Sequence, residues 1–181
     1  MPDILVNRAP VLILWATVVA RRLGYKEEEA LTLGKAVAGQ TAAAKGKRLG
    51  LYAGKTTSEA ETLREKRQDL GAGLVEFMGR AIPCLRTDGG LRALDEARPT
   101  DPEAVRRYLA SRFGEALSSV RDRLEALAAA HAPAELERAA MDLYMQFRPS
   151  APPGASGWGQ RGRLDLDEIE RLATARRRRG S

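Results

Sequence analysis

The pattern of apolar and polar positions begins with an almost wholly apolar run over residues 9–20. This run is shorter than the roughly 18 apolar residues that a membrane-spanning helix requires, so it predicts a buried core helix. Pro10 suits the first position of that helix because its backbone angle is fixed and it lacks an N–H group, and Asn7 stands nearby as a candidate cap. Gly24 is expected to end the helix.

A second helix is expected from Glu27 to about Ala44, with three carboxylates at its start, where the helix dipole favours negative charge. Small residues recur at every fourth position and would form a flat face: Ala30, Gly34, Ala38 and Ala42. An interior glycine lowers helix stability by about 1 kcal/mol relative to alanine, and close packing is the natural compensation. The expected occupants of this face are large side chains of the first helix: Leu14, Trp15 and Val18.

The next segment, residues 45–57, is basic and interrupted by glycines, which is typical of a loop. Ser58 and Glu61 have the spacing of a capping box, so they predict a helix that ends at about Leu70, before Gly71. That helix contains few apolar residues. We therefore expect it to lie on the surface.

Between residues 74 and 94 the period of the pattern changes. Three short strands are predicted at 75–78, 81–85 and 91–94, joined by turns. Pro83 would confine its strand to an edge or a bulge. Residues 91–97 would serve equally well as a helical turn, and the pattern leaves that alternative open.

The C-terminal part opens at a clear boundary, where Thr100 and Glu103 form a second capping box and Pro102 sits early in the helix they begin. An apolar stripe then predicts one long helix, bent at Gly114, with these inward residues: Val105, Leu109, Phe113, Leu117, Val120, Leu124 and Leu127. Another helix starts at Pro133. The two would form a helical hairpin that packs back on the first helix.

Residues 148–163 are rich in Pro, Gly and Ser, and we expect a loop in which Trp158 is buried, with a plain linker as the alternative. A short last helix should follow, with Ile169 and Leu172 on its inner side. The tail of four arginines, residues 176–179, is expected to be disordered.

Together these elements predict a mainly α protein: a helical bundle with a small β-hairpin element. We divide it into an N-terminal part with the basic loop and the β element (1–98), a C-terminal helical hairpin (99–147), and a linker with a short helix and basic tail (148–181). A winged-helix-like arrangement is one version of this fold, because a hairpin would then follow the helices.

The turn between the first two helices resembles a helix-turn-helix in its spacing of small and apolar residues: Val19, Ala20, Leu23, Gly24, Tyr25 and Leu33. In that motif the three glutamates at 27–29 would enter a groove of DNA, where their charge is unfavourable. We therefore favour a plain helical hairpin over a DNA-reading geometry.

The charge is concentrated at the two ends of the chain. The net charge is +6; residues 1–55 carry nine Lys or Arg against four Asp or Glu, and residues 148–181 carry eight against four. The segment 56–105 is acidic, with seven cations against ten carboxylates. The two basic ends could share one footprint on a polyanion or act separately.

The strongest candidate for phosphate contact is the basic loop, with these residues: Lys45, Lys47, Arg48 and Lys55. A second, less specific candidate is the arginine tail, which would act as an auxiliary arm: Arg176, Arg177, Arg178 and Arg179. A solvated loop and a solubilising tail are the competing interpretations, and the sequence leaves them open.

Few residues suggest catalysis. His131 is the only histidine and is expected to sit at a helix end, and the single Cys84 reads as a small core residue. Gly50 is separated from the Gly54-Lys55 pair by three residues instead of the four of a phosphate-binding loop, which disfavours nucleotide binding. We expect no metal, no cofactor and no enzymatic activity, although an enzyme of unfamiliar design remains a third alternative.

A lone cysteine agrees with a reducing compartment, and the N-terminus does not resemble a secretory signal, so we expect a cytoplasmic protein without a membrane segment. The leading hypothesis is a non-catalytic nucleic-acid-binding protein. The alternative is a helical protein-interaction module or homodimer that uses the small-residue face of the second helix or the stripe from Val105 to Leu127.

Overall fold

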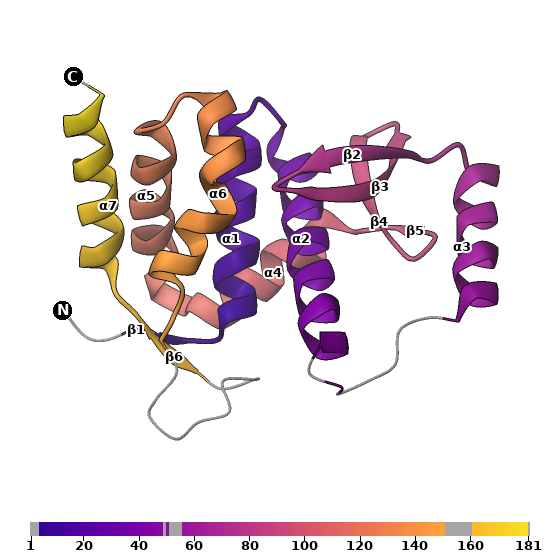
Figure 1. Ribbon diagram of the computed structural model, residues 1–181, viewed down its shortest axis with the longest axis horizontal. Helices are drawn as coiled ribbons and strands as arrows, with labels where there is room; N and C mark the ends of the chain where they lie inside the picture. Colours follow the sequence, from indigo (N-terminus) through magenta and orange to yellow (C-terminus); the bar gives the residue numbers. More distant parts are fainter. Residues whose placement is uncertain (1–3, 49, 51–55, 151–160, 181) are drawn as a thin grey trace.

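The central element of the computed structural model, which describes residues 4–48, 50, 56–150 and 161–180, is helix α1 (Arg8–Arg22). Other helices surround it (Figure 1), and every residue from Pro10 to Ala20 is buried. The predicted core helix is confirmed. It starts before Pro10, however, and Asn7 occupies the capping position without a side-chain capping hydrogen bond.

Helix α2 (Glu27–Arg48) runs back alongside α1 after a turn at Gly24, whose φ of 107° favours glycine. A Cβ added at Gly34 would lie 2.6 Å from the carbonyl oxygen of Ile13 and 2.7 Å from the hydroxyl oxygen of Thr17. The expected close approach of the two helices is confirmed, but Ile13 and Thr17 face Gly34, in place of the Leu14, Trp15 and Val18 that the sequence suggested.

Trp15 points instead to α6 (Pro133–Phe147). Its indole N–H donates a hydrogen bond to the carbonyl oxygen of Ala140 over 2.9 Å, and its ring meets that of Phe147 edge-on at a centroid distance of 5.4 Å. The polar atom of the tryptophan is thus bonded inside the core, as burial requires. The C-terminal helices therefore do pack back on α1, as predicted.

A four-stranded antiparallel sheet follows in the order β2-β3-β4-β5, formed by β2 (Gly73–Phe77), β3 (Arg80–Thr87), β4 (Gly90–Asp95) and β5 (Arg98–Pro99). The three predicted strands are confirmed, and the helical alternative at 91–97 is not formed. Pro83 lies opposite Leu74 of β2, whereas pairing with β4 begins only at Cys84. The proline thus sits where β3 has a single neighbour, which suits its missing N–H.

Helix α2 packs against β4 of this sheet and makes two hydrogen bonds with its main chain. The Glu29 carboxylate accepts a hydrogen bond from the backbone N–H of Leu91 at 2.9 Å, and the Thr32 hydroxyl accepts one from the N–H of Ala93 at 3.0 Å. Both acceptors lie in the first turns of α2 and both donors in β4. The sheet is therefore held to the start of α2 by hydrogen bonds from main-chain N–H groups of β4 to these two side chains.

Helix α3 (Thr57–Asp69) stands beyond the sheet (Figure 1), and none of its residues is buried. This confirms the predicted surface helix. Its cap is displaced from the predicted pair, because Thr56 has extended geometry and bonds the N–H of Glu59 while the Glu59 side chain bonds back. The capping box is therefore formed by Thr56 and Glu59, two positions before the predicted pair of Ser58 and Glu61.

The predicted long helix is broken at Gly114 rather than bent. Helix α4 (Pro102–Phe113) and α5 (Leu117–Ala129) are separated by the 3-10 turn Gly114–Ala116, and Gly114 has a positive φ of 55°. Figure 1 shows that α4 runs across the foot of α5. The cap of α4 is Asp101, which accepts from the N–H of Glu103, because Thr100 is turned inward and is buried.

The N-terminal segment pairs with the segment before the last helix in a short antiparallel pair that the sequence did not suggest, β1 (Ile4–Val6) with β6 (Gly162–Leu164). Helix α7 (Leu166–Arg179) then packs on α5, with Ile169 buried. The arginine tail is the last turn of this helix, so the expectation of disorder is wrong. Trp158 lies outside the described residues.

The mainly α fold with a small antiparallel β element is confirmed, and the C-terminal hairpin is formed by α5 and α6. The division of the chain into three parts stays a prediction. Within the described part of the chain, no helix has the length and hydropathy to cross a membrane.

Candidate functional site

The basic segment that follows the small-residue face is helical over its first residues. Helix α2 continues to Arg48, so Lys45, Lys47 and Arg48 belong to its last turn instead of a loop. The alanine-rich sequence before them has high helix propensity, and cations complement the negative end of the helix dipole. Lys55, like the glycine-lysine pair that suggested a phosphate-binding loop, lies outside the described residues.

Arg80, which no sequence pattern singled out, lies beside the second half of α2. Its guanidinium donates to the Thr41 hydroxyl at 3.2 Å, and the Gln40 side-chain amide donates to the carbonyl oxygen of Ala81 at 3.2 Å. Thr41 and Lys45 are four residues apart on a helix and therefore share a face. The start of β3 thus adds a cation next to the basic end of α2.

The arginines of α7 are partly committed to structural contacts. Arg176 donates from Nε to a carboxylate oxygen of Glu135 at 2.7 Å, and a second guanidinium nitrogen also bonds this carboxylate. The hydrogen bonds and charge of Arg176 hold the pKa of Glu135 below its ordinary value. Arg177 contacts the Thr174 hydroxyl at 3.3 Å. The pairing of Arg176 with Glu135 joins α7 to the start of α6.

The two predicted basic clusters lie far apart, at the lower and upper edges of the view in Figure 1. In Figure 1 the C-terminal end of α2 is at the lower edge and that of α7 at the upper edge. This follows from the topology, because α2 descends from a turn at the top while α7 ascends from β6 at the bottom. A single footprint that combines residues 45–48 with 176–179 is therefore excluded.

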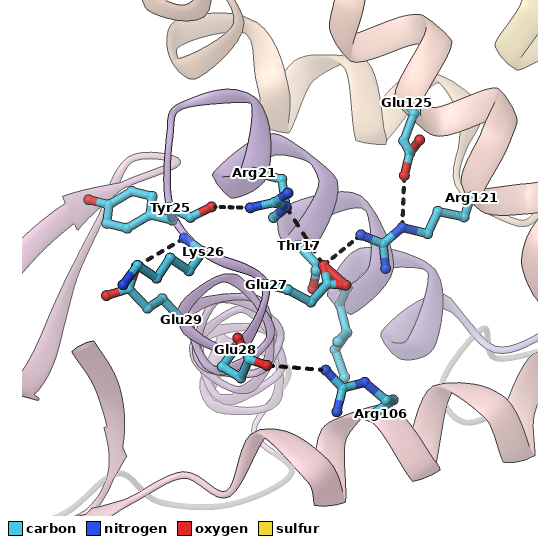
Figure 2. A network of polar contacts seen from close by, with 11 residues as sticks. Thr17, Arg21, Tyr25, Lys26, Glu27, Glu28, Glu29, Arg106, Arg121 and Glu125 are labelled. Carbon is cyan, nitrogen blue, oxygen red and sulfur yellow. Dashed lines mark hydrogen bonds and ion pairs between the residues drawn. The ribbon is translucent and has the colours of Figure 1, made fainter. Parts of the chain in front are cut away.

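The start of α2 is enclosed by ion pairs, which Figure 2 shows. Glu27 accepts from Arg121 of α5 at 2.6 Å and lies 3.9 Å from Arg21, and Arg121 also bonds Glu125 at 2.8 Å. Burial alone would raise the pKa of Glu27, but the hydrogen bond and charge of Arg121 outweigh it, so the pKa lies below its ordinary value. These contacts join the turn between α1 and α2 to α5.

The other two glutamates of this turn are also bonded. Glu28 lies 3.8 Å from Arg106 of α4. Glu29 accepts from the N–H groups of Leu91 and Lys26, and these bonds lower the pKa of its carboxyl. Glu29 and Thr32 are thus bonded to β4, and α2 packs alongside α1. The plain helical hairpin is confirmed.

The two residues with catalytic potential have structural roles. His131 is buried just beyond α5, where its ring Nδ1 lies 3.0 Å from the carbonyl oxygen of Leu127 and its own carbonyl oxygen accepts from Arg22. Burial raises the pKa of the Cys84 thiol to about 11, so it stays protonated at neutral pH. No group of three candidate metal ligands is found among the residues that the structure describes.

Both surfaces that the alternative hypothesis assigned to a partner are used in part inside the molecule, but Ala38, Ala42 and Val105 also line an open apolar groove. Ala30 and Gly34 are buried, and Gly34 packs against α1. The stripe of α4 and α5 is buried at these positions: Val105, Leu109, Phe113, Val120, Leu124 and Leu127. Most of the small-residue face and of the stripe is therefore occupied by intramolecular packing, and the interaction module stays a prediction.

The geometry thus leaves one basic helix end with a neighbouring arginine and one arginine-rich helix end as candidate sites. Comparisons of this chain with protein-family models, with curated proteins and with solved structures find no match.

Proposed function

We propose that the protein is a non-catalytic nucleic-acid-binding protein that grips phosphates with the basic end of α2. The observation that carries the proposal is the position of Arg80, which is bonded to α2 one turn before Lys45. The 29 residues between Glu29 and Glu59 contain no carboxylate, so the cations of this segment have no acidic neighbours in sequence. Such a site contacts phosphates without reading bases.

The arginines of α7 form a separate and weaker contact in this proposal. They lie at the other end of the protein and would reach only a long or second nucleic acid. Removing them should lower affinity for long duplexes more than for short ones. A cytoplasmic location belongs to the same proposal, since a reducing compartment suits the single thiol.

The test is the binding of labelled random-sequence duplex DNA, single-stranded DNA and RNA between about 50 and 200 mM salt, followed by fluorescence anisotropy. The double variant Lys45→Ala/Lys47→Ala should reduce the salt slope by about 2, because each phosphate contact contributes about one released counterion. The matched control removes two exposed cations of α3, Arg64→Ala/Lys66→Ala, and should keep the slope of the wild type. Absence of binding at low salt, or equal effects of the two variants, would refute the proposal.

A second candidate function is supported by an exposed apolar edge. Strand β2 is an outer strand of the sheet, and Leu74 within it and Leu70 just before it are 70% and 47% exposed. An outer strand with unpaired main-chain groups can accept a strand of a partner. Light scattering over a range of concentrations tests the homodimer version: a dimer that Leu74→Glu dissociates supports it, and a monomer at every concentration argues against it.

A further inference from the structure

An apolar groove of about 460 Å³ lies between α1, α2 and α4. Ile13 contributes from α1, Ala38 and Gly39 from α2, and Val105 and Tyr108 from α4. Three helices thus form its walls, and its volume falls within the roughly 300–1,000 Å³ of typical small-molecule sites. The groove is separate from the basic end of α2 and does not depend on the nucleic-acid proposal.

Gly39 lines this groove from an exposed position of α2. The other interior glycine, Gly34, is required by the contact with Ile13, whereas a Cβ added at Gly39 would meet no atom within 4 Å. An interior helical glycine lowers stability by about 1 kcal/mol relative to alanine. No packing contact among the described residues compensates for this lower helix stability at Gly39. Because Gly39 is itself exposed, it lies at the mouth of the groove, and its missing side chain leaves that mouth open.

The charge beside the groove is positive. Lys35 is the one charged residue among the described residues that line it, and its side chain is 48% exposed. Its partner, Asp95, lies 3.9 Å away and is largely exposed, and an exposed pair of this kind is weak and easily exchanged. The Arg112 guanidinium stacks over the ring of Tyr108 at 5.1 Å and adds a second positive charge beside the groove.

We propose that the groove binds an apolar molecule with one carboxylate, of the size of a medium-chain fatty acid. The hydrocarbon chain would lie over Gly39 between Ile13 and Val105, and the carboxylate would exchange with Asp95 for the ammonium group of Lys35. Apolar contact supplies most of the affinity of such a site, and the single cation selects the charged head group.

The experiment is calorimetric titration of the full chain with decanoate and with decanol, each kept below the concentration at which it aggregates. The wild type should bind one equivalent of decanoate saturably. Gly39→Leu should fill the groove and weaken decanoate binding at least tenfold, while its melting temperature stays equal or rises, because the added side chain meets open space and leucine favours the helix. The matched control Ala43→Leu places the same side chain at an exposed position of α2 and should keep wild-type affinity.

Lys35→Gln separates the two halves of the proposal. It should weaken decanoate binding at least fivefold and leave decanol binding unchanged, since only the carboxylate uses the ammonium group. Equal losses for both ligands would overturn the assignment of a carboxylate. Non-saturable binding to the wild type, or wild-type affinity in a folded Gly39→Leu variant, would overturn the site itself.

Discussion

Two faces of helix α2 use the same residue type for opposite reasons. On the face toward α1, Gly34 has no room for a methyl group, because the backbone oxygen of Ile13 lies where it would be. On the face toward the groove, five residues later, Gly39 has empty space around the same position. A glycine at helical spacing therefore indicates a close approach in one place and an opening in the other, and only the neighbouring helices distinguish them.

The difference extends to the surroundings of each face. The closed face belongs to a helix, α1, that is buried from Pro10 to Ala20 and bonded through Trp15 to α6. The open face is bordered by α4, which is joined to the start of α2 by the pair of Arg106 and Glu28. The first region is closed by packing throughout, while the second combines the buried side of α4 with an exposed ion pair and an open groove. Four substitutions test this contrast.

The largest effect is expected in the closed region, for Trp15→Ala. The substitution removes a fully buried ring and its hydrogen bond to Ala140, and we expect a loss of about 3–5 kcal/mol in the free energy of unfolding. Urea denaturation followed by far-UV circular dichroism measures it. A loss below about 1 kcal/mol would mean that α1 does not organise the core.

Gly34→Ala should destabilise the protein by about 1–3 kcal/mol, because the added methyl group collides with a backbone oxygen that cannot rotate away. The gain in helix propensity offsets only part of this. The same denaturation experiment applies. An unchanged or raised stability would show that the two helices can separate at no cost.

Gly39→Ala should act in the opposite direction and stabilise the protein by about 1 kcal/mol, since alanine is the better helix former and its methyl group meets nothing. The free energies of unfolding of the two variants, Gly39→Ala and Gly34→Ala, are measured by the same denaturation experiment and compared directly. Two substitutions of the same sign would erase the contrast between the faces.

The smallest effect is expected for Glu27→Gln, at the ion pairs that fix the turn of α2. The folded-state pKa of Glu27 lies below its ordinary value, so the pair stabilises the protein above the unfolded pKa and this contribution is lost as the pH falls through the folded pKa. We expect a loss of about 0.5–1 kcal/mol at neutral pH that disappears near pH 3. Thermal melts of wild type and variant at both pH values measure it, and a difference that grows in acid would contradict the sign.

Elements whose signals are local could be predicted from the sequence. The apolar run of α1, the alternating strands after Leu74 and the stripe of the C-terminal helices all appear where the pattern placed them. Errors occurred where two local signals competed within a few residues. Thr56 and Ser58 both offer a hydroxyl for a cap, and the chain uses the first.

The candidate site was less predictable, because its parts come from distant segments. The cations of residues 45–48 were identifiable by composition, but nothing near them indicated that Arg80 joins α2 through Thr41. Periodicity likewise pointed out the small residues of α2 without showing which of them faces α1 and which faces a groove. A pattern along one segment carries no information on the segment that will cover it.

The sequence by itself determined most of the helices, the strands β2, β3 and β4, and the concentration of positive charge at the two ends of the chain, since these depend on neighbours in the chain. Only the tertiary structure decided that the basic clusters lie apart, that Trp15 bonds α6, that the N-terminal strand pairs with β6 and that Gly39 borders open space. The physical reason is that propensity and periodicity act within a few turns, whereas packing contacts join residues more than a hundred positions apart.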